Sequence, residues 1–200
     1  MFPELLRRYF PDLDANQIGL LQGHWELLRV WNQKLNLTTI RDVRTAVERH
    51  YAESLFLAAH VSPGPIRIVD IGSGPGFPGF PVAVARPECT VTLVESHQRK
   101  AVFLREASRK VPNIRVLAVR AEDVKERFDL SVSRAVSYRD LEGSLQRLAP
   151  QVLLLAGEEP PPEWPEFVWQ SPIPLPWGDR RSLRSGRVSR ETLGAVSRET

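Results

Sequence analysis

The fold of this 200-residue chain is decided by one stretch, Asp70-Ile71-Gly72-Ser73-Gly74-Pro75-Gly76-Phe77-Pro78-Gly79. It directly follows the apolar, β-branched run Ile66–Ile71, which predicts a buried strand. Glycine permits a left-handed backbone and lets a ligand approach the main chain closely. A strand that ends in such a turn is typical of the first unit of a parallel α/β sheet, whose ligand lies at the carboxyl ends of the strands.

Short apolar runs alternate with helical patterns after the turn Ser62-Pro63-Gly64-Pro65. The predicted strands are Ile66–Ile71, Thr90–Glu95, Ile114–Ala118, Leu130–Ser133 and Val152–Ala156. The predicted helices lie near Pro81–Ala85, Gln98–Lys110 and Leu141–Leu148. This alternation predicts an α/β fold with a doubly wound, Rossmann-like parallel sheet that helices cover on both faces.

The sequence pattern of residues 1–61 predicts a helical extension that precedes the sheet along the chain. Asp14 and Gln17 have the spacing of a capping box, and an apolar stripe at helical spacing follows them. The tryptophans of this helix fall on the stripe, so they are predicted to be core residues. Asp42 can cap a second helix that runs to about Ala59.

The composition divides the chain into four parts. They are a helical extension at 1–61, an α/β core at 62–157, a Pro-rich segment at 158–178 with one candidate edge strand at Phe167–Gln170, and a disordered Arg-rich tail at 179–200. The tail contains Val188-Ser189-Arg190-Glu191-Thr192, which recurs at 196–200. This repeat is too short and too polar to bury a core of its own.

Composition also limits the classes of protein. Cys89 is the sole cysteine, so an intramolecular disulfide and a Cys-based metal site are excluded. The chain has no secretory signal pattern and no run of about 18 apolar residues, so we expect a cytoplasmic protein without a membrane partner. The basic residues are almost all arginine, whose planar fork pairs with phosphate or guanine. This bias permits nucleic-acid binding, although a GC-rich genome produces the same bias.

Two acids beside the glycine-rich turn point to an adenosyl cofactor. Asp70 ends the first predicted strand, and Glu95 ends the second, where a carboxylate can accept both ribose hydroxyls. Pro75 and Pro78 remove N–H donors that the pyrophosphate of a nicotinamide dinucleotide would need. S-adenosylmethionine has no phosphate, and its ammonium and sulfonium groups suit backbone carbonyls and Asp70. The pattern therefore favours a methyltransferase, with a nicotinamide oxidoreductase and a purely topological turn as alternatives.

Two further strand ends carry candidate site residues. Ala121 and Glu122 follow the third predicted strand, where they could contact the adenine edge, although an acid at a helix start is also favoured by the helix dipole. Arg134 closes the fourth strand and is the candidate for the floor of the active site.

These residues resemble the glucose-inhibited division B proteins, bacterial small-subunit ribosomal RNA methyltransferases that modify guanine N7. The likeness covers about residues 15–157, and its most specific motif is Gly-Pro-Gly-x-Pro-Gly at 74–79. It also rests on Trp31-Asn32, Asn36-Leu37-Thr38, Arg49-His50, Ser54-Leu55, Arg86-Pro87-Glu88 and Ser133-Arg134-Ala135.

The resemblance implies a class I methyltransferase that uses S-adenosylmethionine to methylate 16S rRNA at guanine 527 of the 530 loop. The partner would be 16S rRNA, either naked or within the 30S subunit, and we expect a monomer without a metal ion. The cofactor-binding candidates are Asp70, Gly72, Gly74, Phe77, Glu95, Ala121, Glu122 and Arg134. The substrate-facing candidates are Asn36, Arg49 and His50, with a hydrogen-bonded structural role as the alternative for His50.

Guanine N7 carries an in-plane lone pair and no proton at neutral pH, so in-line transfer needs no general base. Arg134 is therefore expected to position substrate or cofactor. The chain departs from the family where Glu53 replaces a usual aspartate and Ala156 replaces a usual lysine. These departures leave a noncatalytic RNA-binding or regulatory protein that retains the cofactor fold as the alternative function.

The terminal repeat generates a prediction about the gene. Val-Ser-Arg-Glu-Thr can be encoded by bases that begin GTTTCACGTGAAAC, which equal their own reverse complement and resemble the bacterial chromosome-partition centromere sequence. We expect the coding DNA to contain this palindrome, so that DNA binding preserves the repeat. Codons that break the palindrome in both copies would leave attraction of RNA by the tail arginines as the explanation.

Overall fold

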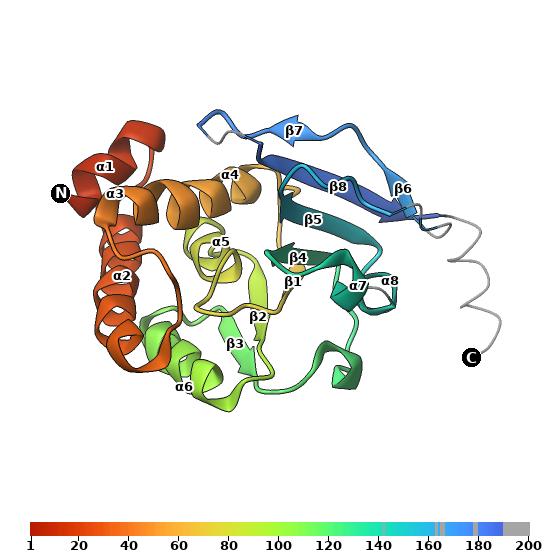
Figure 1. Ribbon diagram of the computed structural model, residues 1–200, viewed down its shortest axis with the longest axis horizontal. Helices are drawn as coiled ribbons and strands as arrows, with labels where there is room; N and C mark the ends of the chain where they lie inside the picture. The colour runs from red at the N-terminus through yellow and green to blue at the C-terminus, as the bar shows by residue number, and fades with distance from the viewer. Residues whose placement is uncertain (142, 163, 165–166, 178–179, 190–200) are drawn as a thin grey trace.

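The computed structural model describes residues 1–141, 143–162, 164, 167–177 and 180–189. Its strands are β1 Arg67–Ile71, β2 Thr90–Val94, β3 Ile114–Leu117, β4 Leu130–Arg134, β5 Gln151–Ala156, β6 Phe167–Trp169, β7 Ile173–Pro174 and β8 Ser182–Val188. They form one sheet in the order β3-β2-β1-β4-β5-β8-β6, with β7 paired to β8 (Figure 1). The first five strands are parallel, and each lies within one residue of its predicted ends.

Alternate side chains of the parallel strands enter two different cores, as expected for a sheet that is covered on both faces. Ile68, Val91 and Leu93 pack on the face that α5 (Gly79–Ala85) and α6 (Gln98–Ala107) cover. Residues such as Val69 and Val94 pack on the other face with α7 (Tyr138–Leu141) and α8 (Ser144–Leu148). The doubly wound α/β class predicted from the sequence is confirmed.

The N-terminal residues form further helices, which pack with α5 and α6 on one face of the sheet. They are α1 Phe2–Tyr9, α2 Ala15–Leu35, α3 Val43–Ala46, a π-helical segment Val47–Ala52 and α4 Glu53–Ala59. The predicted capping box is present, since Gln17 N donates to Asp14 Oδ1 at 2.8 Å and Asp14 N donates to Gln17 Oε1 at 3.0 Å. The Gln17 amide also donates to Val84 O at 3.2 Å, which ties α2 to α5.

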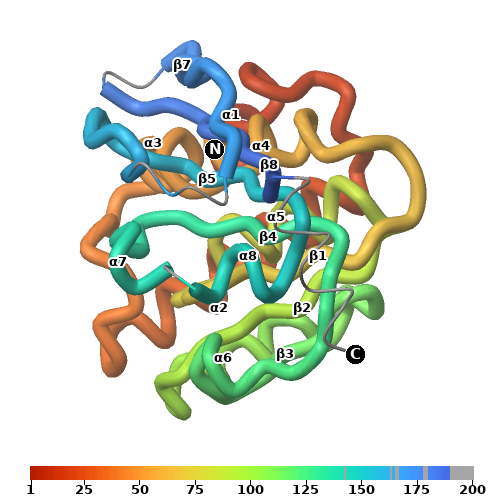
Figure 2. Tube along the Cα trace, turned by 90° about the vertical axis from the view of Figure 1, so that its right-hand side faces the viewer, coloured from red at the N-terminus to blue at the C-terminus, as the bar shows by residue number. Residues whose placement is uncertain are grey.

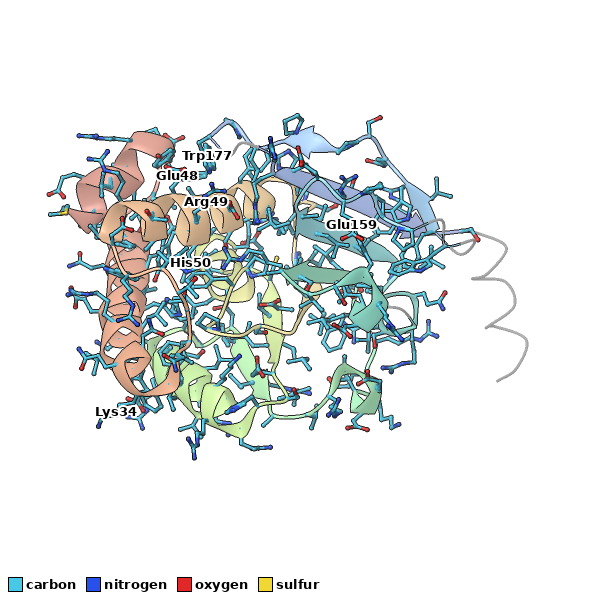
Figure 3. All side chains as sticks on the ribbon, in the orientation of Figure 1. Lys34, Glu48, Arg49, His50, Glu159 and Trp177 are labelled. Carbon is cyan, nitrogen blue, oxygen red and sulfur yellow. The ribbon has the colours of Figure 1, made fainter. Side chains whose placement is uncertain are left out.

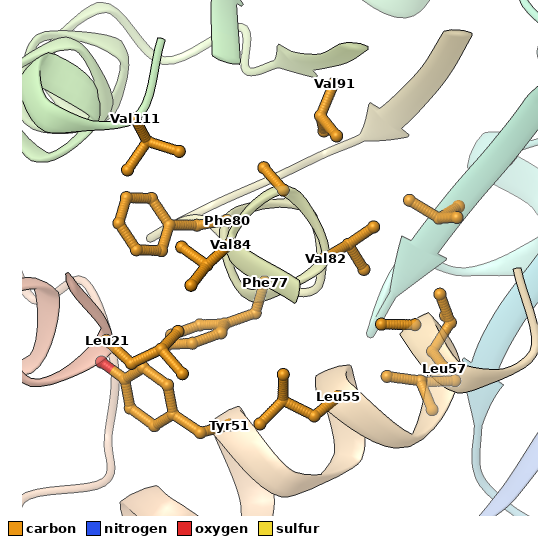
Figure 4. Packing of buried hydrophobic residues seen from close by; sticks show 14 of the residues in the cluster. Leu21, Tyr51, Leu55, Leu57, Phe77, Phe80, Val82, Val84, Val91 and Val111 are labelled. Carbon is orange, nitrogen blue, oxygen red and sulfur yellow. The ribbon is translucent and has the colours of Figure 1, made fainter. Parts of the chain in front are cut away.

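The helical extension shares one continuous core with the sheet (Figure 4). Leu21 of α2, Tyr51 and Phe80 are buried together with strand residues such as Val91. Trp25 is 4% exposed, as predicted for a core residue. Because these side chains pack against each other, the predicted boundary at residue 61 does not separate two cores.

The C-terminal part differs from the prediction. Residues 179–200 are predicted to be disordered, whereas β8 pairs antiparallel with β5 from Gln151↔Arg187 to Ala156↔Ser182 and with β6 on its other side. Figure 2 shows β8 near β5 and β7. Leu183 and Val188 are buried by these neighbours, although most residues of β8 are polar or glycine. Phe167–Trp169 forms the predicted edge strand. The repeat lies mostly in residues 190–200, outside the described residues.

A glycine in β8 provides a test of this packing. An added Cβ at Gly186 would lie 2.8 Å from the Trp169 ring and 3.2 Å from Val152 Cγ2, so Gly186→Ala forces neighbours to move. We expect a loss of about 1–3 kcal/mol in the free energy of unfolding, measured by urea denaturation. Gly157→Ala is the matched control, since nothing lies within 4 Å of its added Cβ. Equal stability of the two variants would contradict the tight contact between β8 and Trp169.

Candidate active site

The glycine-rich loop connects β1 to α5 at the carboxyl edge of the sheet. Gly72 and Gly74 have φ values of +69° and +56°, which L side chains rarely adopt. Gly72 N and Ser73 N both donate to Val94 O at 3.0 Å, and Gly74 N donates to Glu95 Oε2 at 2.9 Å. These bonds fix the start of the loop to the end of β2.

The remaining N–H groups of the loop are also engaged inside the protein. Gly76 N and Phe77 N donate to Ser73 O at 2.7 and 3.0 Å. Gly79 N donates to Asp70 Oδ2 at 2.9 Å, and Phe80 N donates to Gly76 O at 2.8 Å. Since prolines 75 and 78 have no N–H, every backbone donor from residue 72 to residue 80 has an internal acceptor.

The two predicted acids both hold this loop. Asp70 is fully buried, and burial raises its pKa to about 7 although the hydrogen bond from Gly79 opposes this shift. Its Oδ1 atom is buried without a hydrogen-bond partner. Glu95 accepts from His97 N at 2.7 Å as well as from Gly74 N. Each carboxylate keeps acceptor capacity for a further donor, because an ionised carboxylate has about four acceptor positions.

The loop backbone is uncovered at Gly74, and a cavity lies at the ends of two neighbouring strands. An added Cβ at Gly74 would approach only Gly72 O, at 3.9 Å, whereas one at Gly72 would lie 2.7 Å from Val136 Cγ2. A cavity of about 210 Å³ lies where β4 and β5 end, and its lining includes Arg134, Ala156 and Arg181. The open side of the loop can therefore receive a chain-like group against the main chain.

Arg134 lies between the loop and the helical extension. One guanidinium nitrogen is 2.7 Å from His50 Nδ1, and another donates to Arg49 O. The guanidinium carbon lies 5.2 Å from the centre of the Phe77 ring, within the range of a cation–π contact. Burial lowers the pKa of Arg134 to about 10, so the side chain remains a cation at neutral pH.

His50 is a buried part of the same arrangement. Its ring stacks on Phe77 at a centroid distance of 4.4 Å, and its Nε2 lies 2.9 Å from Thr38 Oγ1. Because a guanidinium only donates, His50 Nδ1 must accept from Arg134, so Nε2 carries the hydrogen. Burial, together with the charge of Arg134, lowers the pKa of His50 to about 2. The predicted substrate-facing role of His50 does not fit this burial, and the hydrogen-bonded alternative fits it.

A buried carboxylate neutralises part of the positive charge here. Glu53 is fully buried, and its Oε2 lies 2.6 Å from a nitrogen of Arg181 and 3.7 Å from one of Arg134. Arg49 lies 3.8 Å from the other oxygen of Glu53. The sequence predicted none of these ion pairs. It placed Arg181 in a disordered tail, and this is wrong because β8, which begins at the next residue, pairs with β5 and brings Arg181 to Glu53.

The other predicted residues lie apart from this cluster. Ala121 and Glu122 form a 3₁₀ turn after β3, where Glu122 is exposed and Ala121 O accepts from Arg147 at 2.6 Å. Asn36 ends α2 in a left-handed conformation and is exposed. Figure 3 labels Arg49 and His50 on the helical segment that leads into α4. Sequence reasoning missed His24 of α2, whose ring contacts the loop.

The part of the chain that the structure describes contains neither a membrane-spanning helix nor a cluster of metal ligands. None of its helices is both long and apolar enough to span a membrane. No group of three or more His, Cys, Asp or Glu side chains that could hold a metal ion occurs among the same residues.

The fold is that of the methyltransferase class of doubly wound proteins. It is similar to a SAM-dependent methyltransferase from Aquifex aeolicus, with a TM-score of 0.56 and 13% identity over 72% of this chain and 93% of that chain. It is also similar to the SAM-bound magnesium protoporphyrin IX methyltransferase of Synechocystis, with a TM-score of 0.58 and 10% identity over 83% and 97% of the two chains.

The chain belongs to the rRNA small subunit methyltransferase G family, whose profile matches residues 17–166. A member from Nitrosomonas europaea is 50% identical over 135 residues, which are 64% of this chain and 62% of that protein. A member from Xylella fastidiosa is 37% identical over 84% of this chain and 86% of its own length. The match thus spans less than two thirds of the Nitrosomonas protein. Membership confirms the resemblance to the glucose-inhibited division B proteins.

The pKa of Asp70 generates a prediction about stability. A carboxyl whose pKa is raised on folding holds its proton more tightly in the folded state, so folded stability falls as pH rises from about 4 towards about 8. Asp70→Asn keeps an acceptor for Gly79 N and removes this titration. We expect the variant to gain stability relative to the native chain as pH rises, measured by urea unfolding. The exposed residue Asp12 supplies the control Asp12→Asn, and parallel pH profiles for native chain and Asp70→Asn would contradict the buried acid.

Proposed function

We propose that this protein transfers the methyl group of S-adenosylmethionine to guanine N7 of 16S rRNA, at guanine 527 of the 530 loop. Family membership supports the reaction and the substrate. The observation that carries the choice of cofactor is the hydrogen bonding of the loop. Since every N–H from residue 72 to residue 80 already has an acceptor, no backbone donor remains for a pyrophosphate.

S-adenosylmethionine fits this arrangement because it has no phosphate. The open side of Gly74 would receive the methionine part, and the buried Asp70 Oδ1 is a free acceptor close to the loop. Glu95 would accept from the ribose hydroxyls with its remaining lone pairs. Gly72, Phe77, Ala121 and Glu122 complete the proposed cofactor contacts. When bound, the cofactor supplies an electrophilic methyl group on a sulfonium.

The residues of the chain would act by positioning. Guanine N7 offers its lone pair directly, so the chain needs no general base, and rate comes from holding the base in line with the methyl group. Arg134 can donate to guanine O6 or to a phosphate, and its contacts with His50, Phe77 and Glu53 keep it in one orientation. Asn36 and Arg49 would contact the RNA around the target base.

The proposed partner is 16S rRNA, alone or within the 30S subunit, met by a monomer in the bacterial cytoplasm where ribosomes are assembled. Several arginines of the extension lie exposed, among them Arg29, Arg41 and Arg44. None of these three side chains forms an ion pair with another residue that the structure describes, so they can neutralise phosphates. This charge supports an RNA partner.

Arg134→Ala tests the catalytic assignment. Removing a charged donor that is held at the reacting end of the site should lower methyl transfer to small-subunit particles by about 100-fold. Transfer of tritiated methyl groups measures this rate, and circular dichroism checks that the variant is folded. Arg115→Ala removes an arginine from an exposed ion pair with Glu126 and is the control. A native rate in the Arg134 variant would reduce that residue to a structural role.

A noncatalytic RNA-binding or regulatory protein is the second candidate, because Ala156 stands in the cavity where the family has a lysine. The two candidates differ in one experiment on the native chain. Binding of S-adenosylmethionine in calorimetry together with methyl transfer supports the enzyme. Binding of RNA without transfer supports the second candidate, and absence of cofactor binding contradicts the enzyme.

A further inference from the structure

His24 lies in the middle of α2, within the helical extension, and it is 2% exposed. Its ring stacks on Phe80 with a centroid distance of 4.2 Å and an interplanar angle of 27°. Its Nε2 is 2.9 Å from Pro75 O, and its Nδ1 is 2.7 Å from Tyr51 Oη. A side chain of the extension therefore reaches the carbonyl of a residue in the glycine-rich loop.

The chemistry of these partners fixes the state of the imidazole. A carbonyl oxygen only accepts, so His24 Nε2 must carry the hydrogen that is shared with Pro75 O. Nδ1 is then an acceptor, and the hydroxyl of Tyr51 donates to it. Burial lowers the pKa of His24 to about 4, so the ring is neutral at physiological pH. One tautomer is defined, with Tyr51 as the donor on one side and Pro75 as the acceptor on the other.

The hydrogen bond from His24 reaches the loop at Pro75, a residue without a backbone N–H donor. The backbone of Pro75 can therefore only accept, and its carbonyl oxygen lies 2.9 Å from His24 Nε2. The next residue is also close, since an added Cβ at Gly76 would lie 3.3 Å from His24 Nε2. The following residue, Phe77, has its ring centre 5.3 Å from that of His24 and carries the stacked His50 on its face. His24 therefore contacts the loop at Gly76 and at Phe77, and the Phe77 ring in turn contacts Arg134.

We propose that His24 is a positioning residue for the cofactor loop, which it holds in the conformation that receives S-adenosylmethionine through its Nε2–H bond to Pro75. The proposal rests on the proposed function for the identity of the cofactor. It makes the helical extension a working part of the cofactor site, because the donor comes from α2 and its orientation comes from Tyr51.

Two variants of nearly equal shape isolate this hydrogen bond. His24→Gln keeps an N–H donor at the end of an unbranched side chain, and His24→Met removes the donor while keeping the length. Both lose the ring stacking on Phe80 to the same extent. We expect calorimetry to show S-adenosylmethionine binding about tenfold weaker in His24→Met than in His24→Gln, in the range for one buried hydrogen bond. KM for the cofactor should rise in the same ratio, while kcat at saturation changes less than about twofold.

His60→Met is the matched control. His60 also bonds to a backbone carbonyl, Phe56 O at 2.8 Å, but at an exposed site outside the loop. Its replacement should leave cofactor affinity unchanged. Equal affinity of the Met and Gln variants at position 24, with both folded, would overturn the proposal.

A second measurement needs no cofactor. Hydrogen exchange at the amides of Gly76, Phe77 and Phe80 in the free protein should be faster in His24→Met than in His24→Gln, because their bonds form part of the held loop. If the native chain bound no S-adenosylmethionine, the proposed function would fail, and equal exchange in the two variants would separately show that His24 does not hold the loop.

Nitrogen-15 NMR of the native protein tests the tautomer even if a variant does not fold. We expect His24 to be neutral from about pH 5.5 to about pH 8, because its pKa is low, and to carry hydrogen on Nε2 only, because Pro75 O can only accept. Hydrogen on Nδ1, or an imidazolium at pH 7, is incompatible with donation to Pro75 from a neutral ring and would overturn the proposal.

Discussion

The saturation of the backbone donors between Gly72 and Phe80 is the constraint on which the rest of the site depends. A loop that carries two prolines and three left-handed glycines cannot be held by regular secondary structure. It is held instead by the end of β2, by two carboxylates and by its own turns. The same bonds leave no N–H for a phosphate, so the hydrogen bonds that shape the loop also support the proposed choice of cofactor.

The site also contains two largely or fully buried charged side chains, Arg134 and Glu53. Arg134 is placed in a largely dehydrated position, which is costly unless the cation has partners. Its partners come from two parts of the chain: Glu53 and His50 from the extension, and Phe77 from the loop. Glu53 is in turn bonded to Arg181, just before β8. An arginine at the end of one core strand is thereby oriented by segments that lie far away in the sequence.

These contacts explain why the chain does not divide into independent parts. The extension contributes buried side chains to the main core, and β8 is inserted between β5 and β6. His24 connects the extension to Pro75 in the glycine-rich loop, and Arg181 connects the segment before β8 to Glu53. Glu53 of the extension lies between Arg134 at the end of β4 and Arg181 just before β8, so charged groups from both flanking segments meet at this edge of the sheet.

The sequence by itself determined the features that depend on local patterns. The five parallel strands, the capping box at Asp14, the glycine-rich loop and the candidate Arg134 all follow from periodicity, turn chemistry and strand ends, because such patterns act over neighbouring residues. The tertiary structure alone decided the burial of His50, the pairing of Glu53 with Arg181, and the contact of His24 with Pro75. These pairs are separated by many residues, and a polar strand such as β8 gives no local signal because its partners, not its own composition, satisfy its backbone and bury its few apolar side chains.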